Sequence, residues 1–139
     1  MNRLLIVLLP LLFAVVACSK MAEDDNCSNP VAKSFIGKWN YSEWYFSIGG
    51  PGQWKPVLPA NQFIEFKKDG SFISTQSFLS GANRFELADN GKIKFYTTSS
   101  PSGFTLMQYE LSADNSELQL YPINPACIEG CSNKFVRMN

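Results

Sequence analysis

Residues 63–78, FIEFKKDGSFISTQSF, carry the clearest secondary-structure signal in the chain. Residues 63–66 and 72–78 alternate between apolar and polar side chains, which is the periodicity of a β-strand with one face against a core. Lys68-Asp69-Gly70 lies between them, and Asp-Gly favours a tight turn because it accepts positive φ angles. The segment therefore predicts a β-hairpin.

The same alternation recurs along the rest of the chain, with turn residues between the alternating segments. Asp89-Asn90-Gly91 and residues 113–116 are further turns of this kind. A longer connection, from Gly49 to Ala60, begins with Gly and Pro residues that end a strand. The predicted strands are residues 37–48, 63–66, 72–78, 84–87, 93–97, 104–111, 118–121 and 133–138.

Eight strands joined mostly by tight turns pair with their sequence neighbours, and a closed ring leaves no strand edge exposed. We therefore expect residues 35–139 to form an all-β domain, an eight-stranded antiparallel up-and-down β-barrel; the alternative is an open β-sandwich. Such a barrel either is filled by side chains or holds one small ligand. The expected core residues are Trp39, Tyr41, Ile64, Phe66, Phe72, Phe85, Leu87, Ile93, Phe95, Tyr109, Leu111, Leu118, Leu120 and Phe135. If all of them point inward, the interior is full.

Residues 1–17 have the features of an export signal. Arg3 precedes an apolar run, Leu4 to Val16, that is shorter than the ~20 residues of a membrane-spanning helix. The run ends in Val15-Val16-Ala17-Cys18, which resembles the lipobox of bacterial lipoproteins. The resemblance implies cleavage before Cys18 and attachment of acyl chains such as palmitate, which anchor a protein in a membrane. The alternative is an ordinary signal peptide followed by a chance cysteine.

Residues 18–34 are mostly polar, and we expect them to form a lipidated, flexible tether with one helical turn from Val31 to Phe35. Residue 19 is Ser; in Gram-negative lipoproteins, Asp at this position marks retention in the inner membrane. The resemblance therefore implies an outer-membrane protein that faces the periplasm or the cell surface. The acidic run Glu23-Asp24-Asp25 is either a signal for the outer leaflet or a solvated part of the tether.

Three cysteines remain besides Cys18, namely Cys27, Cys127 and Cys131. An exported protein enters an oxidising compartment, so a disulfide among them is expected. Cys127 and Cys131 would close a short loop in which Gly130 gives the flexibility for a tight bridge. Alternatively, Cys27 joins the start of the domain to its last strand, where the longer loop restricts the unfolded chain more. A zinc site is not expected, because it requires four ligands and the chain has no His.

Short motifs occur together at both ends of the predicted domain. Gly37-Lys38-Trp39 opens the first strand, residues 49–60 form a long first loop, and the last strand contains Phe135-Val136-Arg137 after the segment 127–131. This combination resembles the lipocalin-like lipoproteins of Gram-negative bacteria, with their G-x-W signature and a large loop over the barrel mouth. The resemblance implies a binding or structural barrel in which Gly37, Trp39 and Arg137 close one end, with the guanidinium over the indole. The chain is shorter than a typical lipocalin and lacks the family's C-terminal helix.

The composition argues against catalysis and against nucleic-acid binding. The chain has 12 Lys plus Arg and 12 Asp plus Glu, so its formal net charge is zero and it offers no basic face to phosphates. It has no His, which removes the commonest general base and the commonest metal ligand. We therefore expect a protein that is not an enzyme and that requires neither a cofactor nor a metal.

The expected function is the binding of a small apolar or amphipathic ligand inside the barrel of a membrane-anchored lipoprotein. The candidate ligand-binding residues are Tyr41, Glu43, Tyr45, Trp54 and Tyr109. Glu43 shares a predicted strand face with Tyr41, so it is either a buried carboxylate that anchors a polar ligand group or is turned outward by a β-bulge. The alternative function is an interaction module with a filled core, which docks an envelope protein or a glycan through the aromatic residues Trp44, Tyr45 and Trp54.

Overall fold

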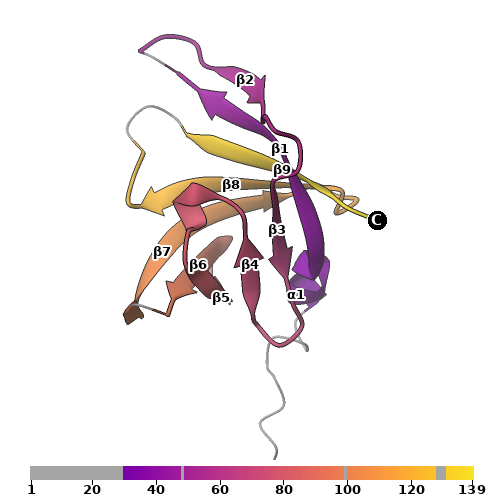
Figure 1. The fold of residues 1–139 in the computed structure, drawn as a ribbon, viewed down its shortest axis with the longest axis vertical. Helices are drawn as coiled ribbons and strands as arrows, with labels where there is room; N and C mark the ends of the chain where they lie inside the picture. Colours follow the sequence, from indigo (N-terminus) through magenta and orange to yellow (C-terminus); the bar gives the residue numbers. More distant parts are fainter. Residues whose placement is uncertain (1–29, 48, 99, 128–130) are drawn as a thin grey trace, which may run out of the picture.

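The computed structural model describes residues 30–47, 49–98, 100–127 and 131–139, apart from the side chains of Pro30 and of residues 100–102. In this part of the chain it confirms an all-β fold with two short helical segments (Figure 1). The elements are α1 (Pro30–Phe35), β1 (Gly37–Phe46), β2 (Gln53–Pro56), β3 (Phe63–Phe66), β4 (Phe72–Ser74), the 3₁₀-helix η2 (Ser77–Leu79), β5 (Ala82–Ala88), β6 (Lys92–Thr97), β7 (Ser100–Leu111), β8 (Glu117–Asn124) and β9 (Ser132–Arg137).

The strands form one antiparallel sheet in the order β4-β3-β1-β9-β8-β7-β6-β5. The sheet curls until its end strands meet, where Ser71 bridges to Arg84 and the Phe85 amide donates to the Gly70 carbonyl over 3.0 Å. The eight-stranded antiparallel barrel is therefore confirmed in a nearly closed form, and the open sandwich is wrong. The predicted turns also form: Gly70, Asn90, Gly91 and Asn115 all adopt positive φ angles.

Two predicted boundaries change on either side of β3. Residues 53–56, expected in a loop over the barrel mouth, form β2 and pair with the second half of β1. The resulting hairpin projects beyond the rest of the barrel (Figure 1). The predicted strand 72–78 ends at Ser74, because the Ser74 hydroxyl accepts a hydrogen bond from the Gln76 amide and turns the chain into η2.

Helix α1 belongs to the barrel and not to the tether. Its residues Ala32 and Phe35 are buried, so the last part of the segment 18–34, which was expected to be a tether, packs against the barrel from Ala32 onward. The signal peptide, Cys18 and Cys27 lie outside the described residues. Residues 30–139 close their own sheet around their own core, so we expect this part of the chain to fold without the residues that precede it.

A cluster of aromatic residues fills the barrel near α1. The Phe66 ring lies at its centre, with centroid distances of 5.4 Å to Phe35, 4.9 Å to Phe85 and 5.1 Å to Phe72. Most predicted core residues are buried; Leu87, Tyr109 and Leu111 are only partly buried but pack against the cluster. The core also contains five residues that the alternation does not predict, namely Ala32, Phe35, Val57, Leu79 and Met107. This part of the interior is therefore filled by side chains.

The end of the barrel at α1 is closed around Trp39, which is fully buried. Its indole Nε1 donates to the Phe35 carbonyl over 2.9 Å, and the Arg137 guanidinium lies 4.1 Å from the ring centroid. Arg137 also donates to the carbonyls of Asn115, Ile36 and Ser34. Gly37 has a φ of +129°, and a Cβ there would lie 3.1 Å from Arg137 Nη1, so this position favours glycine. Three chain segments are thus joined at this end.

Replacing Arg137 with methionine should lower the free energy of unfolding by about 2–4 kcal/mol, because three carbonyl oxygens lose a charged donor. The matched control is Arg84→Met, since Arg84 lies 4.4 Å from the Tyr96 ring on the outer face. An exposed cation–π contact contributes only about 0.5–1 kcal/mol. Urea unfolding of both variants measures the difference, and equal losses would contradict the importance of the carbonyl contacts.

Candidate functional site

A β-bulge in β1 determines which side chains face the open end of the barrel. Tyr41 pairs with Phe135 and Glu43 with Lys134, so Ser42 is an extra residue in β1. The Ser42 hydroxyl donates to the Lys134 carbonyl over 3.1 Å and holds the bulge in place. The bulge reverses the alternation, so that Trp44 and Phe46 join Tyr41 on the inner side while Glu43 turns outward.

A cavity of about 660 Å³ lies at this open end, beyond the packed aromatic cluster. Its volume is within the range of small-molecule sites in proteins. Most of its lining is apolar or aromatic, and none of the described residues that line it is charged. The lining residues are Tyr41, Trp44, Tyr45, Phe46, Ser47, Phe78, Pro122, Ala126, Cys127, Cys131, Ser132 and Asn133. We call this space the mouth cavity.

The floor of the mouth cavity contains one polar pair. The Tyr41 hydroxyl donates to Asn133 Oδ1 over 2.5 Å, and the Tyr41 ring stacks on Phe135 with a centroid distance of 4.9 Å. Burial raises the pKa of the Tyr41 phenol to about 12, so it stays neutral at physiological pH. Because Tyr41 and Asn133 come from neighbouring strands and satisfy each other, they form a fixed base between the cavity and the core.

The rim of the mouth cavity is held by a disulfide between Cys127 and Cys131, whose Cα atoms are 5.7 Å apart. Of the two predicted pairings, the structure therefore contains the short one, within the β8–β9 connection. Pro122 and Ala126 complete this side of the rim. The bridge fixes Cys127 and Cys131 beside each other at the rim.

Only part of the predicted ligand set lines the mouth cavity. Tyr41 forms its floor and Tyr45 borders it. Glu43 instead forms an ion pair with Lys134 at 2.7 Å on the outer face, because the bulge turns it out. Trp54 packs against Tyr45 at a centroid distance of 5.4 Å, since β2 extends the sheet and does not cover the mouth. Tyr109 packs against Phe35 at the closed end.

Sequence reasoning missed several cavity residues. Strict alternation from Trp39 and Tyr41 would place Trp44 and Phe46 on the opposite face of β1, but the bulge at Ser42 brings them to the inner side. Phe78 belongs to η2, where a strand was expected. The position of Asn133 could have been predicted from the sequence. It precedes the core residue Phe135 by two residues in β9, and residues two apart in a strand lie on the same face, which here is the inner one.

A smaller groove of about 230 Å³ lies on the outer face of the same sheet and is lined by Tyr45, Trp54, Tyr121, Cys131 and Ser132. Trp54 is 36% exposed and Lys134 Nζ lies 4.4 Å from its ring. Ser132 Oγ is buried without a hydrogen bond of normal geometry in the described chain. Burial, together with the hydrogen bond to Glu110, raises the pKa of the neighbouring Tyr121. In this outer groove the exposed Trp54 meets the half-buried rings of Tyr45 and Tyr121.

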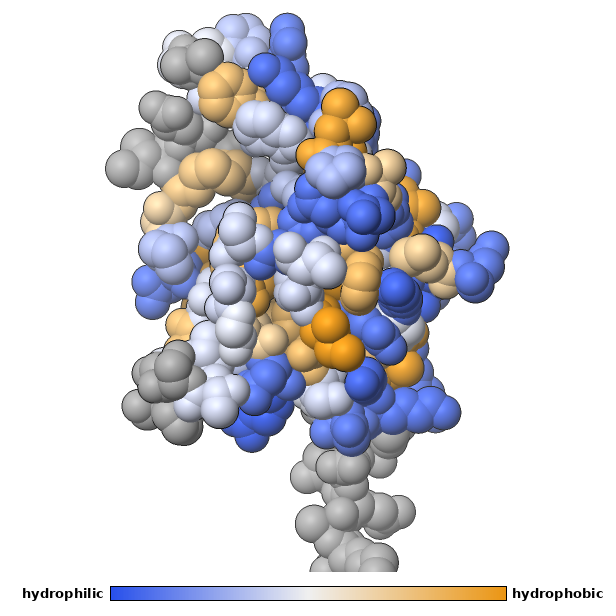
Figure 2. Space-filling model, viewed as in Figure 1, coloured by the Kyte–Doolittle hydropathy of each residue, from blue (hydrophilic) through white to orange (hydrophobic). Residues whose placement is uncertain are grey.

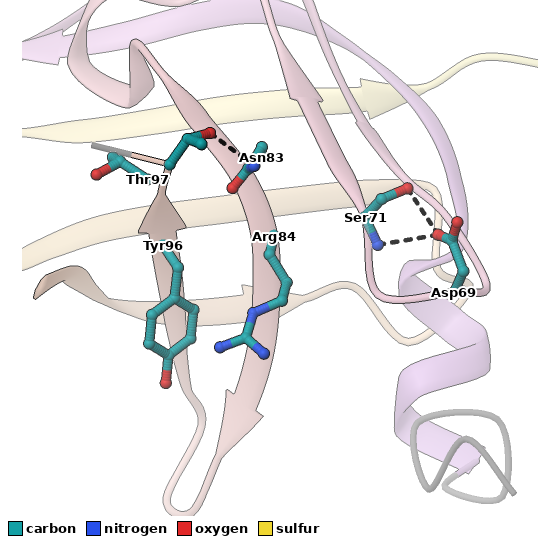
Figure 3. Close-up of a pocket in the computed structure, with 7 residues that line it drawn as sticks. Asp69, Ser71, Asn83, Arg84, Tyr96 and Thr97 are labelled. Carbon is teal, nitrogen blue, oxygen red and sulfur yellow. Dashed lines mark hydrogen bonds between the residues drawn. The ribbon is translucent and has the colours of Figure 1, made fainter. Parts of the chain in front are cut away.

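A third hollow, of about 460 Å³, lies at the seam between β4 and β5 (Figure 3). Its polar groups already bind one another: Asp69 accepts from the Ser71 amide and hydroxyl, and Asn83 donates to the Thr98 hydroxyl over 2.8 Å. The Arg84 guanidinium stacks on Tyr96. Each of these contacts stays on one side of the seam and occupies polar groups of the hollow, so its geometry does not favour a ligand.

On the face shown in Figure 2, hydrophobic residues appear as separate small patches among hydrophilic ones. Within the described residues, no group of three or more His, Cys, Asp or Glu side chains is placed to hold a metal ion. No helix in the same part of the chain is long and apolar enough to cross a membrane. The mouth cavity is thus the best candidate site.

No known protein family, curated protein or solved structure matches this chain.

Proposed function

We propose that this chain is a lipid-anchored binding protein of the bacterial outer membrane that holds a small apolar or amphipathic ligand in its mouth cavity. The observation that carries the proposal is the apolar cavity of about 660 Å³ above a rigid, packed interior. Contact with Trp44, Phe46 and Phe78 removes apolar ligand surface from water, at roughly 25 cal/mol per Å². The proposal includes no catalytic step, in keeping with the uncharged side chains among the described residues of the lining.

The lipobox-like segment that ends at Cys18 supports the anchor, since acyl chains there would tether the barrel through residues 19–29. The likeness to lipocalin-like lipoproteins supports the same function. It rests on Gly37, Trp39 and Arg137, which lie together at the closed end.

A second candidate function is the docking of an envelope protein or a glycan at the outer groove. It is favoured by the pair of exposed Trp54 and half-buried Tyr45, because surface Trp and Tyr are frequent at binding hot spots. Trp44 does not contribute to it, since it faces the mouth cavity. Docking there needs no internal space, so a test of the mouth cavity separates the two candidates.

The test replaces Ala126, an exposed residue on the rim, with tryptophan, so that an indole occupies part of the mouth cavity. We expect the neutral dye Nile red to bind the chain from residue 19 onward, with enhanced fluorescence. We expect Ala126→Trp to weaken binding by about tenfold or more, which corresponds to about 1.4 kcal/mol of lost contact.

The matched control is Ala113→Trp, which places the same side chain in the exposed β7–β8 turn at the other end of the barrel. Its affinity for the dye should equal that of the parent chain. Equal affinities of all three proteins would show that the dye binds elsewhere, and no binding to the parent chain would favour the docking candidate.

A further inference from the structure

A further hollow, separate from the outer groove and from the hollow at the seam, continues the mouth cavity along the inner side of the β1–β2 hairpin. It has a volume of about 290 Å³ and is lined by Phe46, Ser47, Gly50, Pro51, Gln53 and Lys55. Phe46 and Ser47 line both spaces, so the two hollows adjoin. The larger one is mostly apolar, whereas the smaller one contains an amide and an ammonium group. An apolar space is thus extended by a polar one.

Lys55 places a positive charge beside the aromatic lining of the mouth cavity. It pairs with Trp44 in the β1–β2 ladder, so its side chain lies on the same face of the hairpin. Its Nζ is 4.7 Å from the Phe46 ring centroid and 5.8 Å from that of Trp44. These contacts hold the ammonium over the rings that line the entrance.

Lys55 forms no ion pair with another of the described residues. The salt bridges there join Lys94 to Glu86 and Lys134 to Glu43. Glu43 lies close along the same hairpin, but the bulge turns it to the outer face, where Lys134 neutralises it. The bulge therefore leaves the inner side of the hairpin with a lysine and no described carboxylate.

We propose that the ligand is a single-chain amphiphile with an anionic head group, its chain in the mouth cavity and its head group at Lys55. This inference rests on the proposed function and adds the charge and the orientation of the ligand. The chain contacts Trp44, Phe46 and Phe78, while the head group stays near solvent at Lys55. The anion keeps most of its hydration in this place, so binding avoids the large penalty for burying a charge.

The expected preference is modest, because Lys55 is exposed. Exposed ion pairs contribute little free energy. We therefore expect an anionic head group to bind only about 2–5 times more tightly than a neutral one. A cationic head group should bind more weakly than the neutral one by a similar factor. The preference should shrink at high salt, because screening acts on exposed charges.

The experiment measures displacement of Nile red by laurate, dodecanol and dodecylamine, each below its micelle concentration, from the chain starting at residue 19. We expect the affinity order laurate, dodecanol, dodecylamine. Lys55→Gln should bring laurate to the affinity of dodecanol and leave dodecanol unchanged. Lys55→Glu should reverse the order.

The matched control is Lys38→Gln, because Lys38 Nζ also lies over an aromatic ring, 3.7 Å from the Phe63 centroid, but on the outer face away from the mouth. This variant should keep the order of the parent chain. If laurate and dodecanol bind equally to the parent chain, or if Lys55→Gln keeps the preference, this inference is overturned while the proposed function stands. If none of the three probes displaces the dye, the proposed function fails as well.

Discussion

Replacing Trp39 with alanine should lower the free energy of unfolding by about 3–5 kcal/mol, the range for a large aromatic residue removed from a core. Trp39 is fully buried where α1, β1 and β9 meet. Its loss leaves a cavity, removes the hydrogen bond to the Phe35 carbonyl and exposes the Arg137 guanidinium to the apolar core. A small domain has only about 5–15 kcal/mol of stability, so this single change removes a large part of it.

Urea unfolding followed by circular dichroism measures this effect. The control is Trp54→Ala, which removes the same side chain from an exposed position and should change stability by less than about 1 kcal/mol. If Trp39→Ala does not fold, Trp39→Phe gives a graded version, since it keeps most of the volume but loses the indole N–H. Equal effects of Trp39→Ala and Trp54→Ala would refute the role of Trp39 in closing the barrel.

Replacing Cys18 with alanine should abolish membrane attachment through lipid. Each buried methylene contributes roughly 0.8 kcal/mol to membrane binding, so two or three acyl chains hold a protein almost irreversibly, and the variant has none. In cells fed an alkyne analogue of palmitate, the parent chain should take up the label. The Cys18→Ala variant should take up none.

The control for this experiment is Cys27→Ala, which removes a cysteine from the same segment and leaves the lipobox-like sequence intact. It should be labelled like the parent chain. Labelling of Cys18→Ala, or loss of labelling in both variants, would overturn the lipoprotein assignment. The proposal for the mouth cavity would stand in either case, since it depends only on the barrel.

The arrangement of the barrel follows from local patterns that the sequence displays. Asp69-Gly70 and Asn90-Gly91 lie in tight turns because their backbones accept positive φ angles, and this joins consecutive strands as hairpins. The alternation of apolar residues then determines which face of each strand is buried. These two signals predict the eight strands that form the barrel, their order and most of the core, but not β2.

The residues that line the candidate site could not be predicted from the alternation of apolar and polar residues, because two features that alternation does not reveal determine them: a β-bulge and the pairing of β2. The bulge at Ser42 is fixed by a hydrogen bond to the Lys134 carbonyl, a contact between strands that are far apart in the sequence. It changed the orientation of Glu43, Trp44 and Phe46. Strand β2 lacks an apolar alternation because all its residues are exposed, so its pairing with β1 was not visible.

Alternation also assigns a side chain to a face without giving its level along the barrel axis. Tyr41 and Tyr109 were both predicted on the inner side, but Tyr41 lies below the mouth cavity and Tyr109 packs against Phe35 near the closed end. The position of a side chain along the barrel axis depends on the register of the strands and on helix α1. The sequence did not reveal that this helix packs into the core. For this reason the ligand site moved from the barrel interior to its mouth.

Native mass spectrometry of the chain from residue 19, mixed with laurate, tests the mouth cavity most directly. The account predicts one laurate bound per chain, lost on denaturation and much reduced in Ala126→Trp but not in Ala113→Trp. A bare protein mass at saturating laurate, or equal occupancy in all three proteins, would contradict it.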